Sequence, residues 1–415
     1  MLNNTDKYLT LFNNSNYLIS FDIARILAML LILFLHIESG FNDYTGNSFD
    51  NFIYIGPLGV PIFFFISGFL IFKSLSDKPN LNFFNFLYKR LLRLIPLYYS
   101  LLFIYILCIL LFSGALNNYQ EINLSKIITS LFFGFGRMDK TYLSASWALW
   151  PEFAFYSFTA LFLIKGPEDN IKKLFTGLTF IGASQIFPGG GFLGTYGAWG
   201  IEAIKPWSKD ASSIGILLTC FGNLTCVFGI SFCLKVLKNF LNLIFKNNKY
   251  FLKRDNISIL ITFVLSSYFY SEGSYYFYFV AGAMLFICFK TKNLSILLIH
   301  ISLLGIISLL SLKNDLNSLM IYFIFLFVPI LEKLIVNFNS ILKKIIKLFS
   351  KISYTIYLTQ IFTIPIYFKI ASFLWKENLI YWNNLINCFI FTIISAYIVW
   401  NILEKPFNKI FFRKN

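Results

Sequence analysis

Long apolar runs recur along the 415 residues of the chain, and short polar or basic stretches separate them. Runs of roughly 15–24 apolar residues are long enough to cross the hydrocarbon core of a bilayer as a helix. The pattern predicts twelve spans, at residues 17–37, 54–75, 91–113, 147–165, 172–187, 213–234, 256–271, 273–290, 294–312, 318–335, 351–374 and 380–403. The run 172–187 is the weakest because it is short. Since the loss of one hairpin would remove two spans, we expect about 10–12.

Composition predicts the same class of protein. Hydrophobic residues make up 57% of the chain, aromatic residues 20% and charged residues 13%. Such a chain has too little polar surface for a water-soluble globule. The apolar run that follows the polar amino-terminal stretch has no small-residue cleavage site, so we expect it to be retained as the first span. The prediction is an all-α, polytopic transmembrane helix bundle, with one integral-membrane domain over 1–415 and no appended soluble domain.

The distribution of positive charge predicts the orientation of the chain. The formal net charge of +16 would suggest a nucleic-acid partner in a soluble protein. If the amino terminus is cytoplasmic, 26 of the 35 Lys and Arg residues fall on the inner side, eight fall on the outer side, and Arg25 alone lies within a span. The positive-inside rule then places the amino and carboxyl termini in the cytoplasm. We therefore expect a multi-pass protein of the cell inner (cytoplasmic) membrane, with membrane lipids and no nucleic acid as partners.

Two further patterns bear on the kind of protein. The six cysteines lie in or beside apolar runs without C-x-x-C spacing or histidine partners, so we expect packing thiols and neither a metal site nor a disulfide. No internal repeat is evident at the level of motifs, which counts against a transporter built from duplicated halves. Twelve spans with both ends inside still describe many secondary transporters, so a glycan or small-molecule transporter is the alternative.

The first span contains three ionisable residues, Asp22, Arg25 and His36, within FDIARILAMLLILFLH. Arg25 and His36 are about three helical turns apart, so they point about 20° from one another and lie roughly 16 Å apart along the axis. Asp22 precedes Arg25 by one turn and can neutralise its charge. An arginine within a span costs about 2.5–3.5 kcal/mol, so it normally faces a polar cavity or a partner. Asp22, Arg25 and His36 thus form a charged stripe along one face of the helix. The stripe is either functional or consists of a structural ion pair and a hydrogen-bonded histidine. His300, by contrast, is expected to be structural.

Further motifs follow the charged span in a recognisable order. They are PLGVPIFFFISGFLIFKSL (57–75), FLYKRLLRLIPLYY (86–99), SWALWPEFAFY (146–156), SKISYTIYLTQIF (350–362) and LEKPF (403–407). With the first span, their order and spacing resemble the membrane-bound acyltransferase family 3, whose members acylate sugars of envelope and surface polysaccharides. The resemblance leaves the part of the chain from about 160 to 350 without a motif.

The resemblance implies a reaction and its substrates. A chain of about ten or more helices would take an acyl group, commonly acetyl, from cytoplasmic acyl-CoA and deliver it to a carbohydrate hydroxyl. The donor would then be a substrate, acetyl-CoA or another acyl-CoA, and no permanently bound cofactor is expected. The acceptor would be a glycan or a lipid-linked sugar.

The resemblance also places family motifs on particular residues. The Arg-x10-His pattern falls on Arg25 and His36. The WSLxxExxFY motif falls on Trp147, Ala148, Leu149, Glu152, Phe155 and Tyr156. Two positions depart from the family. Ala148 stands where serine is usual, and Gln360 stands where a histidine is frequent, so a second catalytic histidine is missing there.

The residue chemistry suits acyl transfer without help from the resemblance. Such a reaction needs a base near the acceptor hydroxyl, stabilisation of a tetrahedral oxyanion and a site for a polyanionic donor. His36 has an intrinsic pKa suited to the base, and the guanidinium of Arg25 suits a phosphate or a carbonyl oxygen. Glu152 would orient His36 or pair with Arg25, because an unpaired carboxylate within a membrane is costly. The expected catalytic residues are therefore His36, Arg25 and Glu152.

Binding residues are expected on several spans. Arg25 and the basic run of Lys89, Arg90 and Arg93 would bind the phosphates of the CoA donor, although the run also fits an ordinary positive-inside anchor. The candidates for binding the acceptor are Asp22, Ser67, Trp147, Tyr156, Tyr354 and Tyr357. Ser67, Tyr354 and Tyr357 fit helix packing equally well. The glycine-rich outer segment 187–208 would cap the acceptor or form an interfacial belt.

The sequence as a whole predicts an integral membrane O-acyltransferase. It would move an acyl group, acetyl first, from cytoplasmic acyl-CoA to a hydroxyl of a lipid-linked or surface glycan. His36 would act as the general base and Arg25 would bind the donor. The transporter alternative predicts flux that continues without acyl-CoA.

Overall fold

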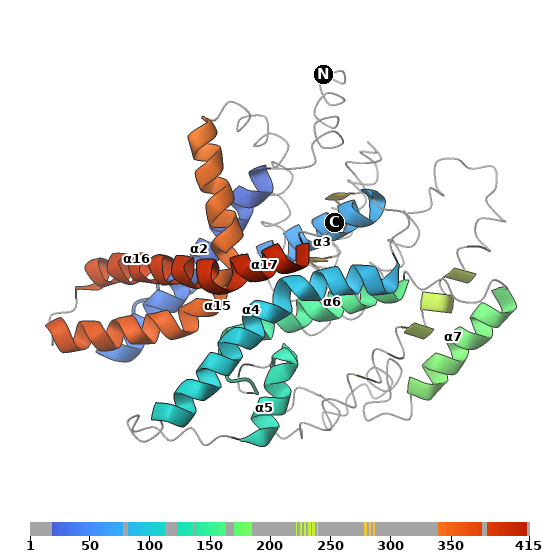
Figure 1. Cartoon of the computed structure of the whole chain (residues 1–415), viewed down its shortest axis with the longest axis horizontal. Coiled ribbons are helices and arrows are strands. Elements are labelled where there is room, and N and C mark those ends of the chain that lie inside the picture. The colour runs from blue at the N-terminus through green and yellow to red at the C-terminus, as the bar shows by residue number, and fades with distance from the viewer. Residues whose placement is uncertain are drawn as a thin grey trace. The chain divides into compact units, whose positions relative to one another are not determined.

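The structure, a computed structural model, consists of helices and the connections between them (Figure 1). It describes residues 19–77, 82–112, 123–136, 138, 140–162, 170–184, 339–375 and 380–412, with scattered positions between 221 and 286. The α-helices in these ranges are α2 (Ile19–Thr45), α3 (Gly59–Asp77), α4 (Phe83–Phe112), α5 (Leu124–Leu131), α6 (Leu149–Phe162), α7 (Asn170–Ser184), α15 (Ser340–Trp375), α16 (Tyr381–Val399) and α17 (Lys405–Phe412). Shorter turns are η1 (Gly56–Leu58), η2 (Phe133–Gly136), η3 (Ser144–Ala148) and the π-helical η6 (Trp400–Glu404). Since these ranges contain no strand, the predicted all-α class is confirmed.

Five of the described helical segments are long and apolar enough to cross a membrane, so the chain is a multi-pass membrane protein. They are Ile19–Thr45, Gly56–Leu75, Phe83–Leu110, Ser340–Leu374 and Tyr381–Phe411, which match the first three and the last two expected spans. The shorter α6 and α7 fall on the expected spans 147–165 and 172–187. The five expected spans between 213 and 335 lie outside the described residues apart from scattered positions. The count of 10–12 spans and the side on which each terminus lies stay predictions.

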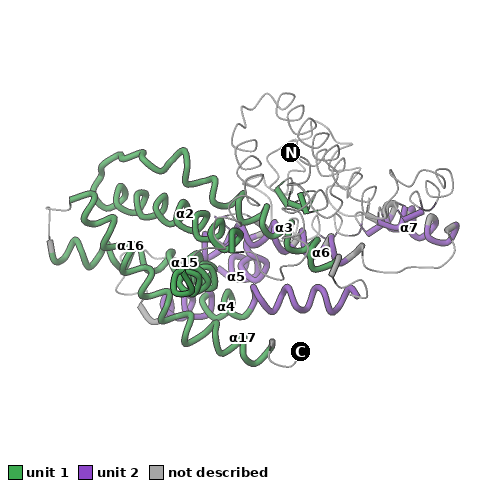
Figure 2. Tube along the Cα trace, turned by 90° about the horizontal axis from the view of Figure 1, so that it is seen from above, with its two compact units in different colours: residues 1–77, 96–101, 265–415 green, residues 78–95, 102–264 purple. Residues whose placement is uncertain are grey.

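The chain divides into two compact units (Figure 2). Unit 1 comprises residues 1–77, 96–101 and 265–415, and unit 2 comprises residues 78–95 and 102–264. Most of α4 therefore belongs to unit 2, while its middle turns belong to unit 1. The single domain expected over 1–415 stays a prediction.

The core of unit 1 is the packing of α2 against α15 and α16. On α2 the buried residues recur at every fourth position, which keeps them on one slowly turning face of the helix. These residues are Met29, Leu33, Ile37 and Phe41, and each is at most 2% exposed. A Cβ on Gly40 would lie 2.6 Å from Cγ2 of Ile364, so glycine lets α2 approach α15 closely.

The helix α15 is bent and longer than a bilayer requires. Its 36 residues would extend about 54 Å if straight, whereas a hydrocarbon core is about 30 Å thick. Figures 1 and 2 show it as two arms joined by a bend. Pro365 lies inside the helix, and it lacks the N–H that would bond to the carbonyl of Ile361, which is a common cause of bends. The basic residues Lys343, Lys344 and Lys347 lie in the first turns, ahead of the expected span 351–374.

Within unit 1, α3 packs at very short range against Phe279 and Gly282, two residues that are helical. A Cβ on Gly68 would lie 1.9 Å from the carbonyl oxygen of Phe279. A Cβ on Gly282 would lie 2.0 Å from the carbonyl oxygen of Phe65. Any side chain at either position would overlap backbone atoms, so this crossing requires both glycines.

In unit 2, buried hydroxyls hold the stretch of chain that leads into α6. The Ser130 Oγ of α5 accepts a hydrogen bond from the backbone N–H of Tyr142 at 3.0 Å. The hydroxyls of Thr141 and Ser146 lie 3.2 Å apart. Both serines are 0% exposed and Thr141 is 2% exposed, so these bonds are shielded from water. They fix the start of α6, which carries two of the predicted site residues.

Candidate active site

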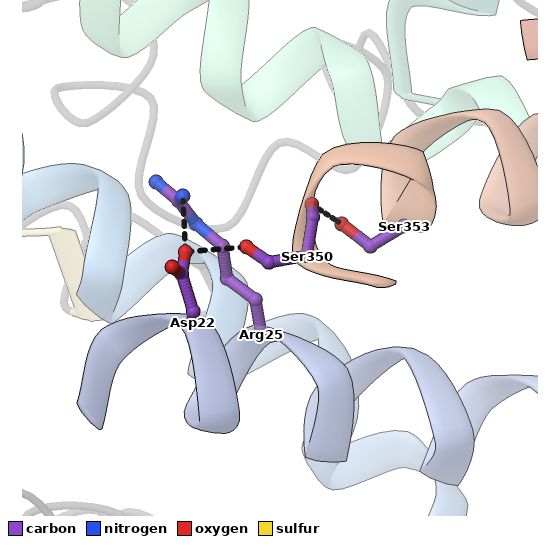
Figure 3. A network of polar contacts seen from close by, with 4 residues as sticks. All are labelled: Asp22, Arg25, Ser350 and Ser353. Carbon is purple, nitrogen blue, oxygen red and sulfur yellow. Dashed lines mark hydrogen bonds and ion pairs between the residues drawn. The ribbon is translucent and has the colours of Figure 1, made fainter. Parts of the chain in front are cut away.

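Asp22 and Arg25 form a polar cluster with two serines where the first turns of α2 meet α15 (Figure 3). Asp22 Oδ1 accepts a hydrogen bond from Ser350 Oγ at 2.5 Å and lies 3.6 Å from Arg25 Nη1. Ser353 Oγ donates to the backbone carbonyl of Ser350 at 2.8 Å. The side chains of Arg25 and Asp22 are 19% and 6% exposed. The structure thus contains the ion pair that the spacing predicts, and it adds a hydroxyl from a helix 328 residues away.

His36 lies near the other end of the same helix, against Gln360 of α15. The imidazole is in polar contact with the Gln360 side chain. Gln360 is 2% exposed, and neither Oε1 nor Nε2 of its amide has a hydrogen bond of good geometry. The two side chains are therefore neighbours that no well-formed hydrogen bond joins. A neutral imidazole has one acceptor nitrogen, which can take a proton from a hydroxyl.

A polar face of α15 follows the charged stripe of α2. Ser350, Ser353, Tyr357 and Gln360 recur at spacings of three and four residues, which places them on one face of the helix. The first of them contacts Asp22 and the last contacts His36. Tyr357, an expected acceptor-binding residue, is 9% exposed on this face. The stripe of α2 is thus covered by polar groups of α15 at both ends.

A buried carboxylate fixes the end of α2 beyond His36. Glu38 is 2% exposed, and its Oε1 accepts a hydrogen bond from the hydroxyl of Tyr381 at 2.6 Å. The same oxygen accepts from the backbone N–H and the side-chain amide of Asn51, both at 3.0 Å. Glu38 Oε2 accepts from the backbone N–H of Phe52 at 2.9 Å. These four bonds tie the end of α2 to the following loop and to α16, so they hold the backbone that carries His36.

Two motifs of the sequence meet at a second carboxylate. Glu404, in the LEKPF motif, lies in the π-helical turn η6 and accepts a hydrogen bond from the hydroxyl of Thr355 on α15. The Thr355 side chain is 0% exposed. π-Helical turns are rare in proteins, and those that occur often lie at functional sites. The contact between Thr355 and Glu404 therefore marks the end of α16 as an unusual local structure.

In unit 2, four of the predicted site residues come together. Tyr156 donates a hydrogen bond to Glu152 Oε1. The Arg90 guanidinium lies over two rings, with Cζ 5.8 Å from the centroid of Tyr156 and 5.6 Å from that of Phe86. Arg93 adds positive charge to the same cluster. A cation over aromatic faces is attracted by the ring quadrupole, so Tyr156 joins Glu152 to the basic run of α4.

The other predicted site residues lie on several separate elements. They are Ser67 on α3, Lys89 on α4, Trp147 in η3 and Tyr354 on α15, all partly buried. The expected contact of Glu152 with His36 or Arg25 would link the two units, and it stays a prediction. The segment 187–208 and His300 lie outside the described residues.

Sequence reasoning missed Ser350 and Glu38, and it treated Gln360 only as the position of a missing histidine. Ser350 and Gln360 lie at helical spacing around Tyr357 in the motif 350–362, and that periodicity is the signal that could have placed both on one polar face. Glu38 gave no such signal, because Tyr381 is 343 residues away in sequence.

Comparison with known proteins adds one match. The sequence model of a family described as an acyltransferase domain matches residues 18–401. The matched range includes the part from about 160 to 350 in which the motifs gave no support. No curated protein and no solved structure matches the chain.

Proposed function

The chain belongs to acyltransferase family 3 and is a membrane acyltransferase, and we propose that it is an O-acyltransferase of the cell envelope. An acyl group, acetyl as the first expectation, passes from cytoplasmic acyl-CoA to a hydroxyl of a lipid-linked or surface glycan. The protein acts in the inner (cytoplasmic) membrane, where donor and acceptor reach it from opposite sides.

The observation that carries the proposal is the polar stripe of α2. Arg25 and His36 lie roughly 16 Å apart along one face of a membrane helix. Both lie against α15, the first through Asp22 and Ser350 and the second through Gln360. Polar groups at two depths of one helix interface suit a reaction that binds an anionic donor at one end and activates a hydroxyl at the other.

The proposed step is a direct acyl transfer. The oxygen of the acceptor hydroxyl attacks the thioester carbonyl carbon, while the acceptor nitrogen of His36 takes the hydroxyl proton. The carbonyl electron pair moves to its oxygen and gives a tetrahedral oxyanion. When the oxyanion collapses, the C–S bond breaks, and the CoA thiolate leaves and takes the proton from the imidazolium. The products are the glycan ester and the CoA thiol.

The residues proposed to bind the donor are Arg25 in unit 1 and, as a separate proposal, the basic run of α4 in unit 2. A guanidinium binds phosphate through paired N–H groups, and Lys89, Arg90 and Arg93 supply further positive charge for the polyanionic end of CoA. Tyr156 lies beneath Arg90 and donates to Glu152. These contacts support a role for Glu152 in placing the basic run.

The first prediction concerns His36 and uses His300, the other of the two histidines, as its matched control. We expect the surface glycan of a deletion strain to lack one acyl substituent by NMR or mass spectrometry, and the wild-type chain to restore it. His36→Ala should lower the rate of restoration about 10²–10⁴-fold, because the general base is lost. His300→Ala should restore it at the wild-type rate.

Membrane levels of each variant are compared by immunoblot, so that loss of protein is not taken for loss of activity. Full restoration by His36→Ala would show that His36 is not the base. A deletion strain that keeps every acyl substituent would refute the proposed function. Loss of the glycan itself from the surface would indicate export.

A further inference from the structure

Gln360 stands out among the buried polar side chains of unit 1. It is 2% exposed, and both its donor nitrogen and its acceptor oxygen lack a hydrogen bond of good geometry. Burying an amide without hydrogen bonds is unfavourable, so native structures rarely keep one without a reason. The amide lies in contact with His36, the proposed base.

A second buried amide in the same helix bundle shows the usual arrangement. Asn384 of α16 is 5% exposed, its Oδ1 accepts a hydrogen bond from the hydroxyl of Tyr367 at 3.0 Å, and its Nδ2 donates to the carbonyl of Ile380 at 2.9 Å. The packing of α15 and α16 thus satisfies an amide where the amide serves structure. The unsatisfied amide is the one beside His36.

Acyl transfer needs a hydrogen-bond donor close to the base. The base and the attacked carbonyl must lie within contact of each other, and the negative charge develops on the carbonyl oxygen. Arg25 lies roughly 16 Å from His36 along the axis, too far to contact the same carbonyl group. Glu38, two residues after His36 and so on nearly the opposite side of the helix, carries a carboxylate that already accepts four hydrogen bonds and has no donor.

We infer that Gln360 is a catalytic residue whose Nε2 donates a hydrogen bond to the carbonyl oxygen of the acyl group during transfer. The inference rests on the proposed function. As the acceptor oxygen attacks and its proton passes to His36, the carbonyl electron pair moves to the oxygen that Nε2–H faces. An amide keeps its donor at every pH, because it does not titrate. The buried amide is left unbonded by the protein because its partner is the reacting oxygen.

The test compares three variants in detergent-solubilised full-length protein. Acetyl-CoA is varied, membranes of the deletion strain supply the glycan, and release of the CoA thiol is followed. Gln360→Leu removes both polar atoms, and Gln360→Glu keeps the size but loses the donor when it is ionised. Each should lower kcat about 10²–10³-fold with little change in the KM for acetyl-CoA, because the donor acts in the transition state. Asn384→Leu is the control.

Thermal stability separates this role from a structural one. Gln360→Leu should melt at or above the wild-type temperature, because it replaces an unbonded amide with an apolar group. Asn384→Leu should melt lower, because it breaks two hydrogen bonds, while the kcat of its folded fraction stays at the wild-type level. Loss of kcat without loss of stability is a result that a purely structural glutamine would not give.

Three outcomes would overturn the inference. Wild-type kcat in either Gln360 variant would show that no donor is needed there. A raised KM with unchanged kcat would assign Gln360 to binding of the ground state. Failure of the wild-type protein to release CoA thiol would refute the proposed function itself, and the inference with it. The first two leave the proposed function standing, so the failures are distinguishable.

Discussion

At the scale of single residues, the contact between Asp22 and Arg25 explains how an arginine is kept in a membrane helix. The pair is 3.6 Å apart, and the Asp22 side chain is 6% exposed. A charged group that loses its partner in apolar surroundings costs roughly 3–5 kcal/mol, far more than an exposed pair contributes. Ser350 adds a charge-assisted hydrogen bond to the same oxygen. The Asp22 carboxylate therefore stabilises unit 1 and also compensates the positive charge of Arg25.

The second prediction follows from this pair. Asp22→Asn should lower the melting temperature of the purified protein more than Ser350→Ala does, because asparagine keeps a hydrogen bond for Ser350 but leaves Arg25 without its counter-charge. The double variant with Arg25→Gln should recover part of the loss, with a coupling of about 0.5–3 kcal/mol. Effects of the single changes that simply add would show that the two side chains are not coupled.

At the scale of elements, the predicted spans and the observed helices differ in a consistent way. The first expected span, 17–37, corresponds to Ile19–Thr45, and the span 351–374 lies within Ser340–Trp375. Hydropathy marks the part of a helix that lies in the hydrocarbon core, whereas backbone hydrogen bonds carry the helix onward into polar surroundings. The lysines in the first turns of α15 set where the apolar run begins, but the helix itself begins before them.

Helix crossings give the third prediction. Gly68→Ala should destabilise the protein by about 1–3 kcal/mol, because the new Cβ would overlap the backbone of Phe279, which cannot move aside. Gly40→Ala is the matched control, since its Cβ meets the side chain of Ile364, which can shift. Melting temperatures in detergent should rank wild type highest, then Gly40→Ala, then Gly68→Ala. Stabilisation by Gly68→Ala, as expected for an open helical position, would contradict the crossing.

At the scale of the whole molecule, the orientation of the chain across the membrane is predicted from its charges and not from helix packing. Lys and Arg crowd the segments assigned to the cytoplasm, including the first turns of α15 with Lys343, Lys344 and Lys347. Helix packing has no preference for one side of a membrane, whereas positive loops resist translocation. Orientation is therefore predicted from sequence and is open to direct test.

The fourth prediction uses single cysteines at exposed positions. Asn47→Cys, in the loop after α2, should react with a membrane-impermeant maleimide in intact spheroplasts, and Lys344→Cys should react only after permeabilisation. The wild-type chain, which has six cysteines, gives the background labelling. The reverse pattern would invert the expected topology, with Arg25 then nearer the outer side and His36 nearer the cytoplasm.

How much of the site was predictable differs from residue to residue. The helical spacing of Asp22, Arg25 and His36 was enough to predict one stripe and a local ion pair, because a period of 3.6 residues sets both. The family motif at 146–156 named Glu152 and Tyr156 but not their hydrogen bond to each other or the place of Arg90 over the Tyr156 ring. Side-chain orientation between two helices depends on their crossing, which spacing within one helix does not contain.

The sequence alone determined the membrane class, the helical composition and the charged stripe, because the bilayer demands long apolar helices and penalises each charge placed within them. Only the tertiary structure decided which groups meet that stripe. Asp22 meets Ser350 across 328 residues, and Glu38 meets Tyr381 across 343 residues. Such contacts follow from the docking of α2 against α15 and α16, where close packing at Gly40 and Ile364 brings the polar faces together. That docking left the amide of Gln360 beside His36, which no pattern along the chain could have shown.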